Sequence, residues 1–313
     1  MDVSLLQASS VLRTTRALEP AYANRIPSIH AKWLPFAGSF EFVQAAFALN
    51  GIYLSMAKRW PNVTDGVVTG AQTMLAVSMT DPEALVVNGK KVDGPGIAMG
   101  RGGSQYRSAE GAPWTSAIVM FPTLMHDRGW PDTGPLHSVV PVARESLNAL
   151  RATLSDLFQI ASLRPERFAS WDAVNGMVES LHGAFDQAFR TSTAAETPSL
   201  TVKHFRIARQ VDEFIAAHAQ RPIYSDEIAD ALGVTSRTLH TVMQTFNGMS
   251  LHRYMRLRRL WMARNALMNA QPSTLVKTVA LDHGFWHLGR FSNEYFRQFG
   301  ETPSQTLSSG RSP

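Results

Sequence analysis

Residues 225–248 read SDEIADALGVTSRTLHTVMQTFNG, and residues 278–303 repeat the same pattern as TVALDHGFWHLGRFSNEYFRQFGETP. When the two stretches are aligned, residues of the same kind coincide: Ala229 with Ala280 and Gly233 with Gly284. After one inserted residue, Leu239 aligns with Phe291 and Gly248 with Gly300. A unit that occurs twice in one chain is a stronger fold signal than either copy alone.

Each copy contains the parts of a helix-turn-helix unit. A small residue (Ala229 or Ala280) lets a second helix cross close by, and a glycine (Gly233 or Gly284) permits the sharp turn. The second helix then keeps an apolar stripe inward, formed by Leu239, Met243 and Phe246 in the first copy and by Phe291, Tyr295 and Phe299 in the second. The sequence therefore predicts helix-turn-helix units at about residues 225–246 and 274–299.

Burying those stripes leaves polar side chains facing outward on both second helices. These candidate DNA-binding residues are Arg237, His240, Thr241 and Gln244 in the first copy, and His287, Gly289, Arg290, Ser292, Asn293 and Arg297 in the second. Short or forked hydrogen-bonding side chains suit base edges and phosphates in a major groove. The alternative is two ordinary solvated faces, and the tandem arrangement disfavours it.

A basic, apolar-periodic segment joins the two copies, from Ser250 to about Asn269. As one helix of about 20 residues it would span roughly 30 Å, close to one turn of B-DNA, roughly 34 Å. One chain could then place two recognition helices in successive major grooves. Five arginines on this segment suit phosphate neutralisation, although some must face the fold: Arg253, Arg256, Arg258, Arg259 and Arg264.

Taken together, these motifs resemble the AraC/XylS family of bacterial transcription regulators. The residues that carry the resemblance are Arg237, Leu239, Gly248, Ser250, Leu251, Tyr254, Arg258, Ala263, Gly284, Phe285, Phe291, Ser292, Gly300, Thr302 and Pro303. The resemblance covers about a third of the chain. It implies a seven-helix domain with two helix-turn-helix units, activation or less often repression of nearby promoters, a cupin-like N-terminal barrel, and dimerisation through helices after that barrel.

Two positions depart from the family pattern. Met243 stands where the family usually has phenylalanine, which a core tolerates. After Pro303 the chain lacks the usual aromatic-arginine pair, so the last helix is expected to be short or frayed.

Length, composition and charge distribution fit a two-domain cytoplasmic protein. The 313 residues suffice for two domains with separate cores, and no apolar run or N-terminal pattern indicates a membrane span or a signal peptide. The absence of cysteine excludes disulfides and cysteine-ligated zinc. From Leu200 onward there are 14 lysines and arginines against 8 acids, leaving 16 against 17 before it, so the positive excess lies where DNA binding would need it.

The first 143 residues are β-rich. Short apolar runs at residues 39–48, 51–59, 73–79, 85–92 and 114–121 predict strands, and Asn50-Gly51, Asp65-Gly66 and Asn88-Gly89 read as turns. Many short strands at such spacing predict a small barrel or roll, for which the family resemblance implies a cupin-like form. The glycine-rich stretch 94–107 reads as a hairpin, with an anion cradle at Arg101–Ser104 as the less favoured alternative.

This half carries no catalytic motif. Its histidines, His30, His126 and His137, are scattered, so no metal site and no cofactor are predicted, and cofactor-binding residues stay unassigned. Its tryptophans suit a core better than a ligand pocket: Trp33, Trp60, Trp114 and Trp130. The sequence predicts that the protein is not an enzyme.

Residues 144–190 predict a helical hairpin, with a leucine stripe (Leu147, Leu150, Leu154, Leu157, Ala161) and a second stripe after Arg164-Pro165. The stripes either pack on the barrel or form a dimer seam. Residues 191–200 read as a linker. Residues 201–308 form the predicted DNA-binding domain.

These features predict a multidomain, sequence-specific DNA-binding transcription regulator. We expect an activator that senses a small-molecule effector through residues 1–143, forms a homodimer, binds double-stranded DNA and contacts RNA polymerase, with no membrane partner. Two alternatives remain: a DNA-bending architectural regulator without a ligand, and, less favoured, a cupin-type enzyme fused to a DNA-binding domain.

Overall fold

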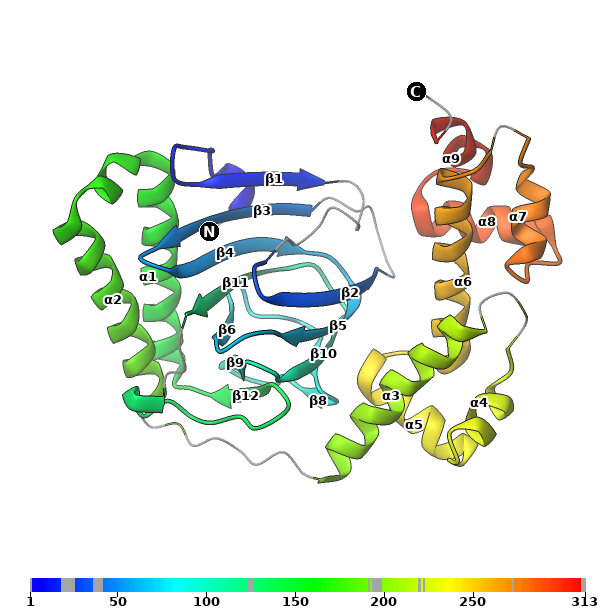
Figure 1. The fold of residues 1–313 in the computed structure, drawn as a ribbon, viewed down its shortest axis with the longest axis horizontal. Coiled ribbons are helices and arrows are strands. Elements are labelled where there is room, and N and C mark those ends of the chain that lie inside the picture. The colour runs from blue at the N-terminus through cyan, green and yellow to red at the C-terminus, as the bar shows by residue number, and fades with distance from the viewer. Residues whose placement is uncertain are drawn as a thin grey trace. The chain divides into compact units, whose positions relative to one another are not determined.

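A computed structural model describes residues 2–17, 26–35, 42–122, 126–190, 192, 199–218, 221, 223–271 and 273–310. These residues form two compact units, one ending at Val202 and the other beginning at Lys203 (Figure 1). The predicted linker lies outside the described residues except for its positions 192, 199 and 200. Within the described ranges, no helix is long and apolar enough to cross a membrane.

The first unit contains two antiparallel sheets. The larger has the strand order β1-β3-β4-β11-β6-β9-β12 and the smaller the order β2-β5-β10-β7-β8. The strands are β1 (Arg13–Ala17), β2 (Ile29–Pro35), β3 (Phe42–Leu49), β4 (Ile52–Arg59), β5 (Asn62–Val68), β6 (Thr73–Ser78), β7 (Leu85–Val87), β8 (Lys90–Lys91), β9 (Gly96–Arg101), β10 (Gln105–Glu110), β11 (Trp114–Phe121) and β12 (Ser138–Pro141). The predicted β-rich N-terminal half is confirmed.

The helical hairpin covers one face of the larger sheet (Figure 1). It consists of α1 (Arg144–Leu163), the short 3-10 helix η4 (Pro165–Ala169) and α2 (Trp171–Phe189); η1 (Val3–Leu5) and η3 (His126–Arg128) are further 3-10 turns. Alternate residues of the central strands, among them Leu54 and Val77, pack with the hairpin in one apolar core. The period of two along these strands thus assigns one face of the sheet to the helices.

The leucine stripe of α1 belongs to this core. Leu147, Leu150, Leu154, Leu157 and Ala161 are all buried in the single chain. The stripe therefore packs on the sheet, as the first of the two interpretations predicts, and these buried residues are not exposed to form a dimer interface. In α2 the stripe is buried from Met177 onward, whereas Trp171, at the start of the helix, is 76% exposed.

The structure corrects two interpretations of glycines. Asp65-Gly66 is not a turn but lies within β5, where a Cβ on Gly66 would come within 2.5 Å of the Tyr106 ring. The glycine-rich stretch 94–107 is not a hairpin, because β9 and β10 belong to different sheets. At the corner between them Gly103 has φ +85°, and a Cβ on Gly102 would lie 1.6 Å from the Gly70 carbonyl oxygen.

A carboxylate on α2 ties the hairpin to the segment before β12. Asp186 accepts hydrogen bonds from Arg128 Nε (3.1 Å) and Nη2 (2.7 Å) and from Trp130 Nε1 (2.7 Å). The Arg128 hydrogen bonds, helped by Trp130 and opposed by burial, lower the pKa of Asp186 below its ordinary 3.8. The contribution to stability is therefore present above pH 3.8 and is lost as the pH falls through the lower folded pKa.

We expect Asp186→Asn to lower the free energy of unfolding at pH 7 by about 0.5–1 kcal/mol, because water screens a carboxylate that is more than a third exposed. The difference from the unmodified protein should shrink as the pH falls below 3.8. Urea denaturation at several pH values measures it. A difference that is the same at pH 7 and at pH 3 would show that the charge is not responsible.

The second unit is helical. It contains α3 (Ser199–Ala217), α4 (Ser225–Ala231), α5 (Ser236–Asn247), α6 (Leu251–Met268), α7 (Val276–Asp282), α8 (Leu288–Phe299) and α9 (Pro303–Ser309). These seven helices of the described residues confirm the helical fold that the family resemblance implies. The last helix is short, as expected, but it is not frayed: Thr302 and Gln305 form a capping box, and Thr306 and Leu307 are buried.

Candidate nucleic-acid interface

The first helix-turn-helix unit is formed by α4 and α5. Gly233, with φ +62°, makes the turn that ends α4, a backbone conformation that favours glycine. Thr235 caps α5 by accepting a hydrogen bond from the Thr238 amide (3.1 Å). Ser236 Oγ donates to Asp226 Oδ1 (3.1 Å), which braces the second helix against the first.

The second unit, formed by α7 and α8, repeats this geometry. Gly284 has φ +78°, and the Phe285 amide donates to the Ala280 carbonyl (2.9 Å), as the Val234 amide does to the Ala229 carbonyl (3.0 Å) in the first unit. Both second helices end at a left-handed glycine, Gly248 or Gly300. The duplication seen in the sequence is therefore also a duplication of backbone hydrogen bonds.

The inward stripes lie where the periodicity predicts them. Leu239, Met243, Phe246, Phe291 and Tyr295 are buried, and Phe299 packs at the edge of its cluster. The Tyr295 hydroxyl lies 2.8 Å from Thr306 Oγ1, which connects α8 to α9. These contacts fix which face of each second helix points outward.

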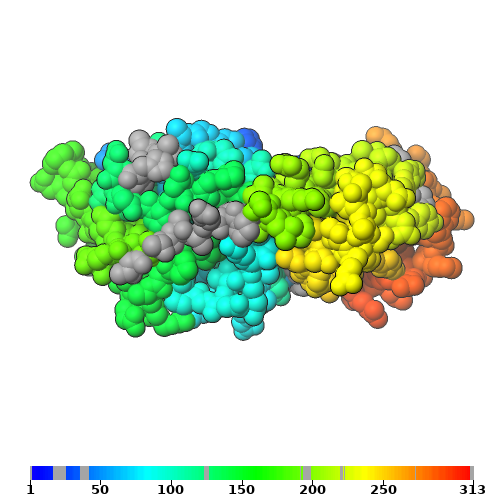
Figure 2. All heavy atoms as spheres, turned by 90° about the horizontal axis from the view of Figure 1, so that it is seen from below, coloured from blue at the N-terminus to red at the C-terminus, as the bar shows by residue number. Residues whose placement is uncertain are grey.

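Nine of the ten candidate DNA-binding residues are exposed, and Ser292 is half-buried. Arg237, His240, Thr241 and Gln244 lie on α5, whose yellow atoms form part of the surface in the space-filling view (Figure 2). The others belong to the second unit: His287 immediately precedes α8, and Gly289, Arg290, Ser292, Asn293 and Arg297 lie on it.

Two of these side chains have intramolecular partners. Thr241 Oγ1 donates to the Arg237 carbonyl (3.0 Å), so its proton is used within the helix. Arg290 Nε donates to Glu294 Oε1 (3.0 Å). Arg237 and Asn293 are both exposed, and each lies in the N-terminal half of its recognition helix.

The connecting helix α6 has 18 residues and is capped by Ser250, whose Oγ accepts from the Arg253 amide (3.3 Å). At 1.5 Å per residue it spans about 27 Å. Three of its arginines are engaged inside the fold: Arg256 with Glu294, Arg258 with Asp212, and Arg264 with Glu301. Arg253 is exposed. The phosphate-binding cluster suggested by the sequence is therefore smaller than five.

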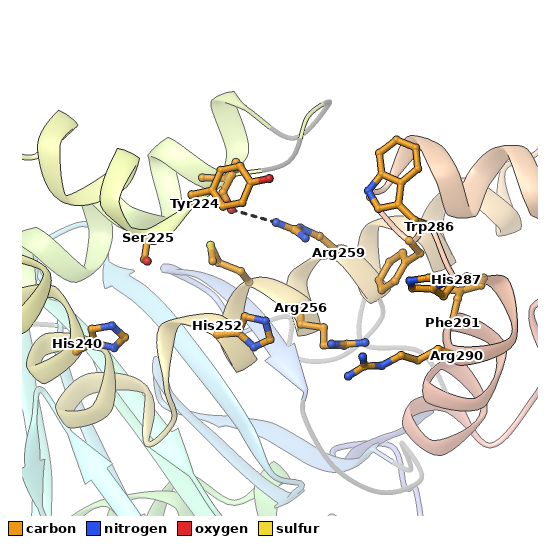
Figure 3. Close-up of a pocket in the computed structure, with 14 residues that line it drawn as sticks. Tyr224, Ser225, His240, His252, Arg256, Arg259, Trp286, His287, Arg290 and Phe291 are labelled. Carbon is orange, nitrogen blue, oxygen red and sulfur yellow. Dashed lines mark hydrogen bonds between the residues drawn. The ribbon is translucent and has the colours of Figure 1, made fainter.

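A cleft of ≈ 370 Å³ lies between the two helix-turn-helix units. His240 of α5 is at one end, and His287 and Arg290 at the start of α8 are at the other. His252, Arg256 and Arg259 of α6 lie between them (Figure 3). None of the 14 lining residues drawn there is an aspartate or a glutamate. The cleft is positively charged and connects the two outward faces.

Arg259 has an unusual place in this cleft. It donates to the Ile223 carbonyl oxygen (3.3 Å), and it forms no ion pair with a carboxylate of the described part of the chain. Burial, together with the charge of Arg256, lowers the pKa of Arg259 below its ordinary value. A half-buried cation without a carboxylate partner is suited to an external anion such as a phosphate.

Sequence reasoning missed the aromatic edges of the cleft. Tyr224 is 72% exposed and Trp286 is 68% exposed, although large apolar side chains usually find a partner surface. Tyr224 precedes α4, and Trp286 follows the turn glycine Gly284 (Figure 3). Neither lies on a recognition helix, so the search for outward helix faces did not find them.

Two glycines of the second unit allow a matched test of the turn. Gly284 is left-handed, whereas Gly289 lies in α8, and a Cβ added there would have no heavy atom within 4 Å. We expect Gly284→Ala to destabilise the domain by about 1–2 kcal/mol, because a Cβ disfavours the left-handed conformation. Gly289→Ala should be neutral or stabilise by up to about 1 kcal/mol. Thermal denaturation measures both, and equal effects would contradict the assignment of the turn.

Comparison with known proteins places this unit among regulators. Residues 228–309 match a family described as a helix-turn-helix domain. A stretch of 102 residues is 38% identical to the XylDLEGF operon transcriptional activator 2 of Pseudomonas putida, and covers 32% of this chain and 64% of that protein. Another alignment of 102 residues is 35% identical to the probable thc operon regulatory protein of Rhodococcus erythropolis, and covers 32% of this chain and 31% of that one.

Among solved structures, a probable AraC family transcriptional regulator from Rhodopseudomonas palustris CGA009 is 36% identical over 34% of this chain and 99% of that chain, with a TM-score of 0.33. The chain aligns with less than two thirds of the length of the two Pseudomonas and Rhodococcus relatives. The similarity to all three thus concerns about a third of this chain.

Proposed function

We propose that the whole protein is a sequence-specific DNA-binding transcription regulator, because its C-terminal domain belongs to the AraC/XylS family of transcription regulators. It acts in the cytoplasm as an activator and responds to a small-molecule effector through its N-terminal unit. Its relatives named above are regulators rather than enzymes, and we propose no catalytic activity.

The observation that carries this proposal is the pair of exposed recognition faces joined by α6. Each face belongs to a helix whose opposite side is buried, so each can enter a major groove without unfolding its unit. The helix between them is about 27 Å long, a length of the same order as the roughly 34 Å between successive major grooves on one side of the duplex. The cationic cleft, with Arg259 at its centre, would then face the phosphates between the two grooves.

An architectural DNA-bending protein without a ligand is the alternative function. A cavity between the two sheets favours the sensor, because a domain that only supported DNA bending would gain nothing from the buried arginine and histidine that line it.

A homodimer and RNA polymerase are the proposed protein partners. Since the leucine stripe is core, a second copy would have to cover other residues of the hairpin. Leu163 and Trp171 are its exposed large apolar side chains, at 70% and 76%.

Selection of bound fragments from random double-stranded DNA by the full-length protein tests the proposal. We expect one enriched motif with two boxes about one helical turn apart. Binding that enriches no sequence would support an architectural role, and an absence of binding at low salt would refute DNA recognition altogether.

A further inference from the structure

The larger sheet has two chemically different faces. The face toward the hairpin is apolar, whereas the face toward the smaller sheet carries Arg59, Ser78 and Ser116 among apolar residues. The smaller sheet contributes Thr64, Tyr106, Ser108 and Glu110 to the same interior. Polar groups are rarely buried between sheets without a reason, so this interior has the composition of a binding site.

Only part of the space between the sheets is filled. Ile26, Val68, Met74, Ile118 and Met120 form an apolar cluster there. Beside them lies a cavity of ≈ 60 Å³. One buried water needs about 10–15 Å³ of such space, so the cavity holds about four to six non-hydrogen atoms.

Arg59 is the cation of this cavity. It is 8% exposed, lies 5.2 Å from the centre of the Trp33 ring, and donates from Nε to Ser116 Oγ (2.8 Å). No ion pair joins it to a carboxylate of the described part of the chain, and no hydrogen bond from its Nη nitrogens is found there. A buried guanidinium without an anion costs folding free energy, which a bound anion would offset.

The nearby carboxyl group of Glu110 does not fill that role. It accepts hydrogen bonds from Asn62 (3.0 Å) and Trp114 (3.0 Å) and a longer one from Ser108 (3.4 Å), and none from Arg59. Burial raises the pKa of Glu110 above its ordinary 4.5, although the charge of Arg59 opposes this rise. Glu110 is therefore held by Asn62, Trp114 and Ser108, and it leaves the Nη nitrogens of Arg59 without a hydrogen-bonded carboxylate.

His137 provides a second, independent sign of a ligand. It is 4% exposed, and its Nε2 atom is buried without a hydrogen-bond partner in the described part of the chain. Its ring stacks on Tyr106 at 4.7 Å, and a Cβ on Gly100 would lie 2.0 Å from it, so the ring is fixed in place. An orphaned ring nitrogen on a cavity wall is a group that a ligand can satisfy.

We infer that this cavity binds a short-chain carboxylic acid as its anion, with the carboxylate on the Nη nitrogens of Arg59 and the carbon chain against Met74, Ile118 and the apolar wall. This inference rests on the proposed function, because the bound acid would be the small-molecule effector of the regulator. A planar guanidinium matches a carboxylate in geometry, and the volume limits the acid to about six non-hydrogen atoms, the size of butyrate.

Butyrate and butyramide are the probes for a direct test, because they have the same shape and differ in charge. We expect butyrate in excess to raise the Tm of the N-terminal transition of the full-length protein, as a ligand of the folded state must. Calorimetric titration should show butyrate binding at least tenfold tighter than butyramide. Equal binding of the two, or no binding of butyrate, would overturn the inference.

Variants assign the binding to Arg59. Arg59→Gln should weaken butyrate binding by about ten- to a hundredfold, because one charge-assisted contact is lost. Lys58→Gln, which removes an exposed positive charge from the same strand, should bind butyrate unchanged. Unweakened binding by a folded Arg59→Gln protein would place the anion elsewhere and refute the site.

If Arg59→Gln fails to fold, the Ser116→Ala variant tests the same site. It removes only the hydroxyl that holds Arg59 Nε, so we expect a folded protein with weaker butyrate binding and unchanged butyramide binding. Unchanged butyrate binding by this variant would count against Arg59 as the anchor.

DNA binding separates this inference from the proposed function. A protein that enriches a DNA motif but does not bind butyrate keeps the proposed function and loses the inference. A protein that binds butyrate through Arg59 and enriches no DNA motif keeps the ligand class and loses the proposed function.

Discussion

The double variant Arg237→Ala with Asn293→Ala is expected to lose about 2–6 kcal/mol of binding free energy on its cognate site, the sum of about 1–3 kcal/mol for each base-reading side chain. The losses should add, because the two residues lie on separate recognition helices, α5 and α8. Both are exposed, and neither substitution opens the buried stripes. Fluorescence anisotropy at one fixed salt concentration measures the change.

A matched variant separates base reading from a general loss of surface charge. Arg206→Ala with Asn265→Ala removes the same residue types from exposed positions on α3 and α6, outside the two recognition helices. We expect this control to bind the cognate site much as the unmodified protein does. If the test variant weakens binding to random DNA as much as to the cognate site, the two residues contact phosphates rather than bases.

Raising the salt concentration from 50 to 200 mM should weaken DNA binding by about a hundredfold, if about four phosphates are neutralised. Apart from Arg237, which is expected to read a base, the arginines available for this are the exposed Arg253, Arg290 and Arg297 and the half-buried Arg259 of the cleft. Arg253→Gln should reduce the slope of log affinity against log salt by about one, equally on cognate and random DNA.

Titrations at four or more salt concentrations give these slopes. A slope near zero would contradict the cationic cleft as a phosphate-binding surface. An Arg253→Gln slope equal to that of the unmodified protein would instead show that this arginine lies outside the interface.

The C-terminal fold could be predicted from the sequence because its signals are local. Apolar residues recur three and four positions apart in α5 and α8, and a glycine stands at each left-handed turn, so the helices and their buried faces follow from short segments. The outward residues then follow by exclusion. The partners of the arginines could not be predicted: Glu294 lies 38 residues from Arg256, and only the folded chain brings them together.

The N-terminal half was harder to predict because its signals depend on pairing across sheets. Asp65-Gly66 reads locally as a turn, yet its glycine makes room for the Tyr106 ring within a strand. Arg59 reads as a surface residue, since arginine is mostly exposed in proteins, yet it is buried against Ser116 and Trp33. The leucine stripe suits either a core or a seam, and only the sheet that faces it decides for the core.

Hydroxyl-radical footprinting of the full-length protein on its selected DNA site tests most directly whether two helix-turn-helix units read one duplex together. We predict two protected patches on the same side of the DNA, about one helical turn apart, because two recognition helices joined by α6 would enter successive major grooves. Inserting about five base pairs between the boxes should abolish one patch, because it rotates that box to the opposite side of the duplex. A single protected patch that is unaffected by the insertion would contradict the account.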